Sequence, residues 1–400
     1  MKRILFVAEA VSLAHVSRPY VLANALLATN RFEVHFASAK RYPIALDSRV
    51  REWPVSSITP DDFRRALQDG RPIYSAATLL RYVDEDLALL DAVKPDLVVG
   101  DFRLSLAVSA PRHGVRYAAI ANAHWSPYAT VRRLSFPEHS FSPLFRGPVG
   151  ALAFNAVQSL LLRHHATPLN RVRRQFGLTA LRSVRDVYTW GDITMYADVP
   201  ELVPTMDLPA SHRYIGPIVW SPEIAAPGWW SELGSAADCV YVTLGSSGQV
   251  RVLPAILQAL AQLPVTVLCA TADRRGFERS SPRVKWAEYL PGLQAARRSR
   301  FVVCNGGSAT VYQALAMGRP VVGVASNLDQ HLTMDAVVRV GAGIKVRAEQ
   351  ANVGAVREAA AALLSDDRFA TAAGNVAQWF AAYSPQERFV SALAELFGAH

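Results

Sequence analysis

Short apolar runs alternate with longer amphipathic segments along the first half of the chain. The apolar runs are rich in β-branched residues, as buried strands of parallel sheets are. They predict strands at 3–8, 32–37, 96–100 and 115–121. Helical spacing predicts helices at 18–29 and 75–92, the first with Ser17 as its N-cap and Pro19 in its first turn. This alternation favours a parallel sheet with helices on both faces.

The same alternation begins again in the second half, after a stretch at 221–237 whose prolines and glycines are typical of a linker. Apolar runs predict strands at 239–244, 265–270, 284–290, 301–304, 320–325 and 343–346. Helical spacing predicts helices at 250–262, 309–317, 329–340 and 385–397. The predicted fold class is therefore α/β, with two Rossmann-like doubly wound domains facing each other across a ligand cleft at the carboxyl ends of their strands.

The composition is that of a compact protein, with 51% hydrophobic and 19% charged residues among 400. The three cysteines lie in apolar runs without metal-ligand spacing, which favours reduced core residues in a cytoplasmic protein and no metal site. The basic N-terminus before the first apolar run imitates a signal peptide, but Glu9 interrupts the run early, so we expect a buried strand there. No uncharged apolar run approaches the length of a transmembrane helix.

The formal net charge is +9 at pH 7, and the chain is rich in arginine. A basic face exposed to solvent would account for this charge without any function. The alternative is affinity for an anionic ligand or peripheral contact with a membrane surface. Nucleic acid is not an expected partner, because the sequence has no interleaved basic and aromatic platform that would stack on bases.

Residues 122–150 differ from the rest of the first half, because they are rich in Pro, Ser, His, Trp and Phe. A long irregular insertion in a compact domain is usually functional or disordered, and this aromatic composition argues against disorder. The segment is predicted to form either one wall of a substrate pocket or a structural wrap over the sheet.

A glycine turn between a strand and a helix, Asn305-Gly306-Gly307-Ser308, is the strongest local signal in the chain. Such a turn points backbone N–H groups, and the positive end of a helix, at the space above the sheet. That arrangement suits a phosphate group. An ordinary strand–helix turn, in which glycine serves only tight packing, is the alternative that the turn alone leaves open.

Several motifs around this turn together resemble the donor-binding signature of GT-B glycosyltransferases of family 1, which use UDP- or dTDP-sugars, particularly the bacterial enzymes that modify natural products. The motifs are Leu290-Pro291, Asn305 to Thr310, Gln313-Ala314-Leu315, Gly318-Arg319-Pro320 and Asp329-Gln330. Further landmarks are Val242 to Ser247, Ile215-Gly216-Pro217, Pro95 to Val99 with Asp101, and His15 ahead of Pro19. The resemblance covers nearly the whole chain and is weakest over residues 122–210, where the fewest family landmarks lie.

The resemblance implies an acceptor-binding domain over 1–219, a linker over 220–237, a donor-binding domain over 238–383, and a terminal helix over 384–400 that packs back on the first domain. In this family a histidine after the first strand is the general base for the acceptor hydroxyl, and an aspartate after a later strand orients it. His15 and Asp101 stand at those positions. A neutral imidazole backed by a carboxylate suits that role.

The resemblance also implies donor contacts in the second half. The diphosphate is expected at Asn305, Gly306, Gly307, Ser308 and Thr310, with Ser246 and Ser247 approaching from another strand turn. Tyr289 beside Leu290 is expected to stack on the nucleobase, or else to be a buried strand aromatic. Gln313 is expected at the ribose, and Asp329 and Gln330 at the sugar hydroxyls. Without the family context, Asp329 would be read as a helix N-cap.

The sequence departs from the family pattern at three positions. The family usually has His at position 305, and Asn can donate to a phosphate oxygen but cannot carry a positive charge. Gln313 replaces the usual Glu, which leaves open a deoxyribonucleotide donor such as a dTDP-sugar. Ala14 replaces a glycine that often precedes the base.

The resemblance thus implies an inverting O-glycosyltransferase that moves a hexose from a UDP- or dTDP-sugar to a hydroxyl of a small apolar acceptor. The nucleotide sugar is a co-substrate, and neither a cofactor nor a metal is expected. Two alternatives remain, a non-catalytic GT-B protein that activates another transferase and a nucleotide-sugar epimerase. The chain is expected to be a monomer or a homodimer.

Overall fold

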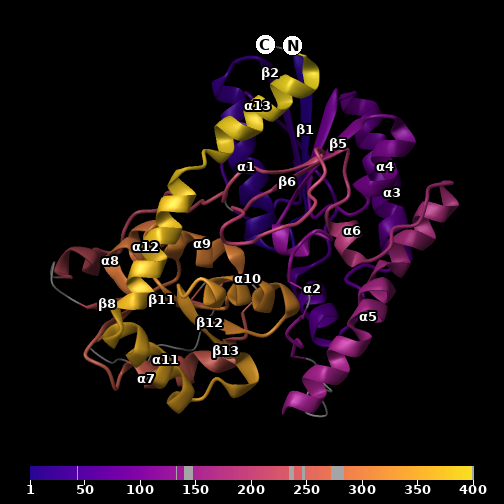
Figure 1. Cartoon of the computed structure of the whole chain (residues 1–400). Helices are drawn as coiled ribbons and strands as arrows, with labels where there is room; N and C mark the ends of the chain where they lie inside the picture. The colour runs from indigo at the N-terminus through magenta and orange to yellow at the C-terminus, as the bar shows by residue number, and fades with distance from the viewer. Residues whose placement is uncertain are drawn as a thin grey trace. The chain divides into compact units, whose positions relative to one another are not determined.

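The computed structural model describes residues 1–42, 44–131, 133–138, 147–233, 238–245, 248–271 and 283–398 (Figure 1). The chain divides into two compact units, each built on one parallel sheet. The first unit comprises Met1–Arg133, His139–Ile218 and Tyr383–His400, and the second comprises Leu134–Glu138 and Val219–Ala382.

The first unit contains a seven-stranded parallel sheet in the order β3-β2-β1-β4-β5-β6-β7. Its strands are β1 (Lys2–Ala8), β2 (Phe32–Ser38), β3 (Arg51–Trp53), β4 (Leu97–Asp101), β5 (Arg116–Ala121), β6 (Ile193–Tyr196) and β7 (His212–Tyr214). The strand order reverses between β1 and β4, where Ala8 pairs with Asp101. In open parallel sheets, ligands bind outside the carboxyl ends of the strands at such a switch point.

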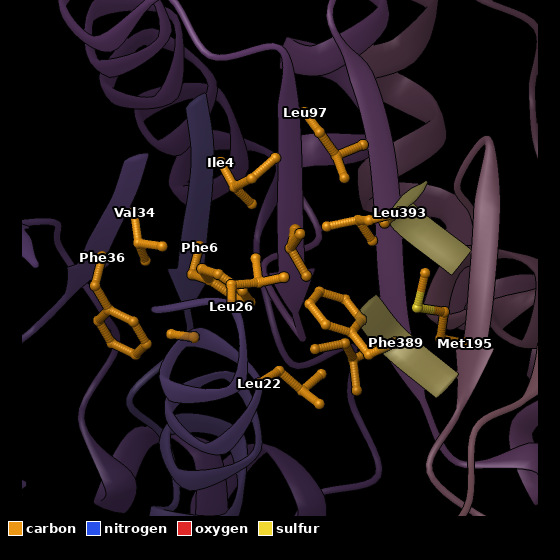
Figure 2. Close-up of a cluster of buried hydrophobic side chains, with 14 of the residues drawn as sticks. Ile4, Phe6, Leu22, Leu26, Val34, Phe36, Leu97, Met195, Phe389 and Leu393 are labelled. Carbon is orange, nitrogen blue, oxygen red and sulfur yellow. The ribbon is translucent and has the colours of Figure 1, made fainter. Parts of the chain in front are cut away.

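The helices of this unit are α1 (Leu13–Ala28), α2 (Pro60–Gln68), α3 (Ala76–Val93), α4 (Leu106–His113), α5 (Gly147–Gln175), α6 (Val184–Tyr188) and α13 (Pro385–Phe397). Figure 2 shows one side of the core, in which Phe6 of β1 lies between the rings of Phe36 and Phe389, at centroid distances of 6.3 and 5.9 Å. Phe389 and Leu393 of α13 are fully buried in this cluster, and α13 packs on α1. The last helix of the chain therefore completes the core of the first unit.

The predicted start of the first helix was wrong. The helix begins at Leu13 rather than residue 18, its N-cap is Ser12, and Ser17 and Pro19 lie inside it. A proline inside a helix removes only one backbone hydrogen bond, and burial of Val16, Leu22 and other residues of α1 outweighs that loss. As a consequence, His15 lies on the first turn of a helix and not in a loop.

The second unit contains a six-stranded parallel sheet in the order β10-β9-β8-β11-β12-β13. Its strands are β8 (Cys239–Thr243), β9 (Thr266–Ala270), β10 (Val284–Ala287), β11 (Ser299–Cys304), β12 (Val321–Ala325) and β13 (Gly343–Arg347). Its helices are α7 (Leu253–Leu260), α8 (Gly292–Arg298), α9 (Ser308–Ala316), α10 (Leu328–Arg339), α11 (Val353–Ser365) and α12 (Asp367–Ala381). The order reverses between β8 and β11, so this sheet too has a switch point.

Two elements in this unit have a boundary that differs from the predicted one by three residues. The strand predicted over 284–290 ends at Ala287, which leaves Tyr289 in the loop before α8. The helix predicted over 250–262 is a short 3-10 turn followed by α7, because Pro254 lies in the first turn of α7 and marks a helix start.

Residues 134–138 lie in the second unit, although the sequence places them within the predicted first domain. The Glu138 N–H donates to the Ser326 carbonyl at 2.7 Å, and Arg347 donates to the Phe136 carbonyl at 2.7 Å. Ser135 bridges Asp335 and Lys345. This short segment is therefore fixed at the carboxyl edge of the second sheet, whereas 132 and 139–146 of the aromatic stretch lie outside the described residues.

Within the described parts of the chain, no helix combines the length and the apolar character needed to cross a membrane.

Candidate functional site

His15 and Asp101 lie together at the switch point of the first sheet. The Nδ1 atom of His15 is 2.7 Å from Oδ1 of Asp101. The Asp101 side chain is 1% exposed and that of His15 is 20% exposed. Arg18 Nη2 is also 3.1 Å from this Nδ1 atom. In the tautomer whose Nδ1 donates to the carboxylate, the lone pair of the ring lies on Nε2, where a general base needs it.

Arg18 completes this pair and was missed by the sequence reasoning. Its Nε and Nη2 atoms donate to the two oxygens of Asp101 at 2.7 and 2.8 Å, a bidentate geometry. Its Nη1 donates to Asn122 Oδ1 at 2.8 Å, and Asn122 in turn donates to the buried Asp198 at 3.2 Å. Arg18 lies three residues after His15 on α1, and this helical spacing was the available signal; the misplaced helix start concealed it.

The imidazole of His15 rests on an aromatic side chain. Its ring stacks on Phe102 with centroids 4.6 Å apart and an angle of 13° between the planes. Phe102 itself has φ of 60°, an uncommon conformation for a bulky residue that only surrounding packing maintains. Tyr188 packs edge-on against Phe102, and Trp125 packs against Tyr188. The His15 imidazole is thus held on two sides, by the Asp101 carboxylate and by the Phe102 ring, next to an aromatic surface.

A second buried charge cluster surrounds Arg103, two residues after Asp101. This guanidinium is fully buried, donates to Glu9, Asp86 and Glu85, and lies 3.9 Å from the ring centroid of Tyr82. Burial raises the pKa values of Glu9 and Asp86, although the charge of Arg103 opposes that rise. Arg103 therefore connects the end of β4 with α3 and with the residue that follows β1. Asp101 is the last residue of β4, and His15 lies on α1, the helix that follows β1.

The glycine turn of the second unit lies at the switch point between β11 and β8. Gly306 has φ of +78°, and a Cβ there would lie 2.8 Å from Met334, so only glycine fits. Gly307 is the N-cap of α9, and the N–H groups of Ser308 and Thr310 belong to the first turn, where no intrahelical acceptor exists. This is the geometry of a helix N-terminus that accepts an anion.

Asn305 supports the turn from within. It is 5% exposed, and its Oδ1 accepts the Gly307 N–H at 3.2 Å. A Cβ on Gly248 would approach Asn305 to 3.0 Å, so the turn after β8 runs close beside the turn after β11. The predicted phosphate contacts Ser246 and Ser247, in that neighbouring turn, lie outside the described residues.

The predicted nucleoside contacts occupy different surroundings. Tyr289 is 47% exposed, as a stacking platform must be, whereas Leu290 is 3% exposed. Gln313 donates through Nε2 to the Trp220 carbonyl at 2.6 Å, and a Cβ on Gly292 would lie 2.7 Å from its Oε1. One hydrogen of the Gln313 amide is therefore already committed to the chain.

The predicted sugar contacts lie at the start of α10. Asn327, not Asp329, is the N-cap, and it forms a capping box with Gln330. The Gln330 Oε1 accepts from the backbone and hydroxyl of Ser326 at 2.9 and 3.0 Å, while its Nε2 has no hydrogen-bond partner among the described residues. Asp329 is half-buried on the first turn of α10. Gln330 thus fixes the loop through one end of its amide and keeps a donor at the other.

His331, the next residue, is a buried neutral histidine. It is 0% exposed, and neither ring nitrogen has a hydrogen-bond partner within the described residues. Burial lowers the pKa of His331 to about 2, and the nearby charges of Lys345 and Arg347 lower it further. Across the same described parts, no three His, Cys, Asp or Glu side chains are grouped so as to hold a metal ion.

Residues 246–396 match the family model of the Erythromycin biosynthesis protein CIII-like C-terminal domain. A PGL/p-HBAD biosynthesis rhamnosyltransferase of Mycobacterium bovis BCG is 48% identical over 381 residues, 95% of this chain and 84% of the relative. This chain belongs to the same glycosyltransferase family. A PGL/p-HBAD biosynthesis glycosyltransferase of Mycobacterium tuberculosis is 44% identical over 95% of this chain and 89% of its own length.

The solved structures agree on the fold. The spinosyn rhamnosyltransferase SpnG, complexed with thymidine diphosphate, matches over 98% of this chain and 100% of that one, with a TM-score of 0.69 at 19% identity. The predicted GT-B fold and the predicted transferase class are confirmed. The roles predicted for individual site residues remain predictions.

Proposed function

We propose that this glycosyltransferase moves a hexose, with rhamnose as the first candidate, from a dTDP- or UDP-sugar to a hydroxyl of an apolar acceptor, with His15 as general base. The observation that carries the proposal is the triad-like contact of His15, Asp101 and Arg18 at the switch point of the first sheet. Rhamnose is the first candidate because the M. bovis relative is named a rhamnosyltransferase.

The proposed reaction is one inverting displacement. Nε2 of His15 takes the proton of the acceptor hydroxyl while that oxygen attacks the anomeric carbon, and the bond from this carbon to the diphosphate breaks. Asp101 accepts the Nδ1 proton and so leaves Nε2 unprotonated, while Arg18 fixes the carboxylate by donating to both of its oxygens. The proton remains on His15 until solvent removes it, and the nucleoside diphosphate leaves with the bonding electrons.

The departing diphosphate is proposed to bind the turn at Asn305 to Ser308, with Thr310 nearby. First-turn N–H groups and the helix dipole stabilise the negative charge that develops there, so no metal is required. A dTDP donor is favoured, because Gln313 has one amide hydrogen bonded to Trp220 and the solved neighbour SpnG was captured with thymidine diphosphate. Tyr289 is proposed to stack on the base, and Asp329 and Gln330 to bind sugar hydroxyls.

The acceptor is proposed to be an apolar natural-product-like or lipid-like alcohol or phenol. The rings of Phe102, Tyr188 and Trp125 lie beside His15 and offer an apolar surface to the molecule that carries the hydroxyl. The curated relatives are named for PGL/p-HBAD biosynthesis, so their acceptors are the first to assay.

The test combines donor binding with transfer. Calorimetry with dTDP and UDP measures the donor preference, and transfer from dTDP-rhamnose is followed with and without EDTA. His15→Ala is expected to keep the dTDP affinity within about 3-fold and to lose at least 100-fold in kcat, since general-base catalysis contributes about that much. Unchanged turnover in His15→Ala, retained anomeric configuration in the product, or EDTA-sensitive transfer would each contradict a part of the proposal.

The same experiment addresses the two alternatives. An auxiliary protein would bind no donor productively on its own, and an epimerase would alter the donor without an acceptor. The family and the solved structures favour the transferase over both.

A further inference from the structure

Helix α5 carries an exposed apolar surface that the glycosyl-transfer chemistry does not use. Among the described residues, nine large hydrophobic side chains are exposed, and five of them lie on this helix. They are Val149, Leu152, Val157, Leu160 and Leu161, with exposures of 80, 75, 44, 63 and 41%. Monomeric proteins rarely leave such side chains gathered on one element without a partner.

The same helix is cationic toward its other end. None of its 29 residues is acidic. Arg163, Arg171 and Arg174 are exposed. Arg173, by contrast, is buried and bonded to the carbonyls of Thr179 and Ala107, so it anchors the helix to the unit. The helix therefore has three exposed positive charges with no acidic residue of its own to pair them.

The apolar and cationic side chains share one face. At 100° per residue, Val149, Leu152 and Leu160 fall within about 100° of one another, and Arg163, Arg171 and Arg174 fall in the same sector. Val157 and Leu161 fall outside this sector. The face is thus apolar over its first half, roughly 17 Å from Val149 to Leu160, and basic over its second half. Figure 1 shows α5 at the margin of the first unit, with its N-terminal end farthest from the strands.

We propose that this face of α5, here named the α5 face (residues 149–174), docks on an anionic phospholipid bilayer. A bilayer offers an apolar interior and anionic headgroups at successive depths, and the α5 face presents apolar and then cationic side chains in that order. Its apolar part is too short to span, so the helix enters the interface and does not cross. The chain's net charge of +9 adds a general attraction to the same surface.

A second copy of the chain is the competing occupant, and the charges argue against it. Two α5 faces aligned in parallel would bring arginine to arginine, with no acidic residue on the helix to relieve the repulsion. An antiparallel pair joined through the apolar halves would leave the basic half of each copy uncovered. A bilayer with negative headgroups removes that cost. The proposal does not rest on the sugar donor or on His15, so it stands or falls separately from the proposed function.

The experiment is vesicle binding of the full chain. Binding to vesicles of phosphatidylcholine and phosphatidylglycerol in equal amounts is compared with binding to phosphatidylcholine alone, by co-sedimentation at low and high salt. We expect at least roughly 10-fold tighter binding to the anionic vesicles, with loss of the difference at high salt.

Two variants test the two halves of the α5 face. Leu152→Asp with Leu160→Asp should weaken binding to anionic vesicles about 10-fold or more, because charged side chains replace the inserted apolar ones. Arg171→Gln with Arg174→Gln should weaken it roughly 10-fold at low salt and much less at high salt. Matched controls are Met206→Asp, an exposed apolar side chain elsewhere, and Arg51→Gln, an exposed arginine elsewhere; both should bind as the parent does.

Circular dichroism and the melting temperature verify that each variant is folded. Equal binding to both vesicle types, or equal binding by variants and controls, would overturn the proposal. So would a concentration-dependent dimer in sedimentation velocity that Leu160→Asp abolishes, because that result would assign the face to a second copy.

Discussion

The carboxyl edges of the two sheets use opposite electrostatic solutions at equivalent switch points. The first edge buries full charges in pairs, with Asp101 bonded to Arg18 and with Arg103 bonded to Glu9. The second edge buries uncharged polar groups at the same place, namely Asn305, Gln330 and the neutral His331. The diphosphate site proposed there consists of backbone N–H groups and glycines.

The difference fits the roles proposed for the two edges. A general base has to be held in one tautomer and one orientation, and a locked carboxylate does that at the expense of burying a charge that Arg18 must then balance. A site for a departing diphosphate gains nothing from a fixed carboxylate, which would repel the phosphate, whereas backbone dipoles are already oriented. The predictions below exchange or remove these charges, from the largest expected effect to the smallest.

Asp101→Asn removes the charge of the first edge with almost no change of shape. Asparagine keeps one acceptor oxygen but replaces the other by an NH2 donor, so the side chain no longer accepts from both His15 and Arg18, the tautomer of the His15 ring is no longer fixed, and the charge of Arg18 is left unbalanced. We expect kcat to fall by roughly 10²- to 10⁴-fold. Steady-state kinetics measure the loss, and dTDP calorimetry is the control. A variant that weakens dTDP binding as much as it lowers kcat would show that Asp101 does not act through His15.

Arg103→Met tests whether the second charge cluster supports the first edge. Removal of the guanidinium leaves Glu9 and Asp86 buried without their cation, which typically costs about 3–5 kcal/mol. The free energy of unfolding in urea measures this cost. Arg65→Met is the matched control, since Arg65 is 65% exposed in its pair with Asp62 and should contribute less than about 1 kcal/mol. Equal effects of the two substitutions would contradict this interpretation.

Asn305→Asp is the reciprocal exchange, because it adds a charge to the second edge while keeping the oxygen that accepts the Gly307 N–H. A carboxylate beside the proposed diphosphate site should weaken dTDP binding roughly 10- to 100-fold through like-charge repulsion. Calorimetry provides the affinity, and the melting temperature verifies the fold. Unchanged affinity would place the diphosphate away from this turn.

The burial of neutral His331 is expected to make the second unit less stable at acidic pH. The pKa of His331 is lowered to about 2 in the fold, so below its ordinary value of about 6.5 the unfolded chain binds a proton that the folded chain does not. Stability should therefore fall as the pH drops below about 6.5, by up to about 1.4 kcal/mol per pH unit from this group. Urea unfolding at several pH values measures the slope.

The matched comparison for this slope uses two histidines. His331→Leu should reduce the loss of unfolding free energy below about pH 6.5. His113→Gln, at a partly exposed histidine paired with Asp91, should change that loss much less. An identical slope in His331→Leu and the parent would assign the acid sensitivity to other groups.

Much of the fold could be predicted from the sequence, because the spacing of apolar residues and the glycines and prolines that end an element are local properties of the chain. Apolar β-branched runs located β1, β4, β8, β11 and β12 within a few residues, and the glycine turn before α9 was identified with its flanking motifs. The short strands β3 and β7, at three residues each, have no such signal and were not predicted. Pro19 misled the placement of α1, because a local rule for helix starts was overridden by burial of the helix.

The sequence by itself determined that two parallel sheets would form, and which turns would stand above each switch point. Only the tertiary structure decided the partners, since those lie far apart in the chain: Arg18 on Asp101, Arg103 on Glu9, and residues 134–138 at the edge of the second sheet. The physical reason is that the periodicity of a strand or a helix depends only on residues close together in the sequence. The pairing of a buried charge depends on which distant side chain reaches it, and burial makes that pairing obligatory.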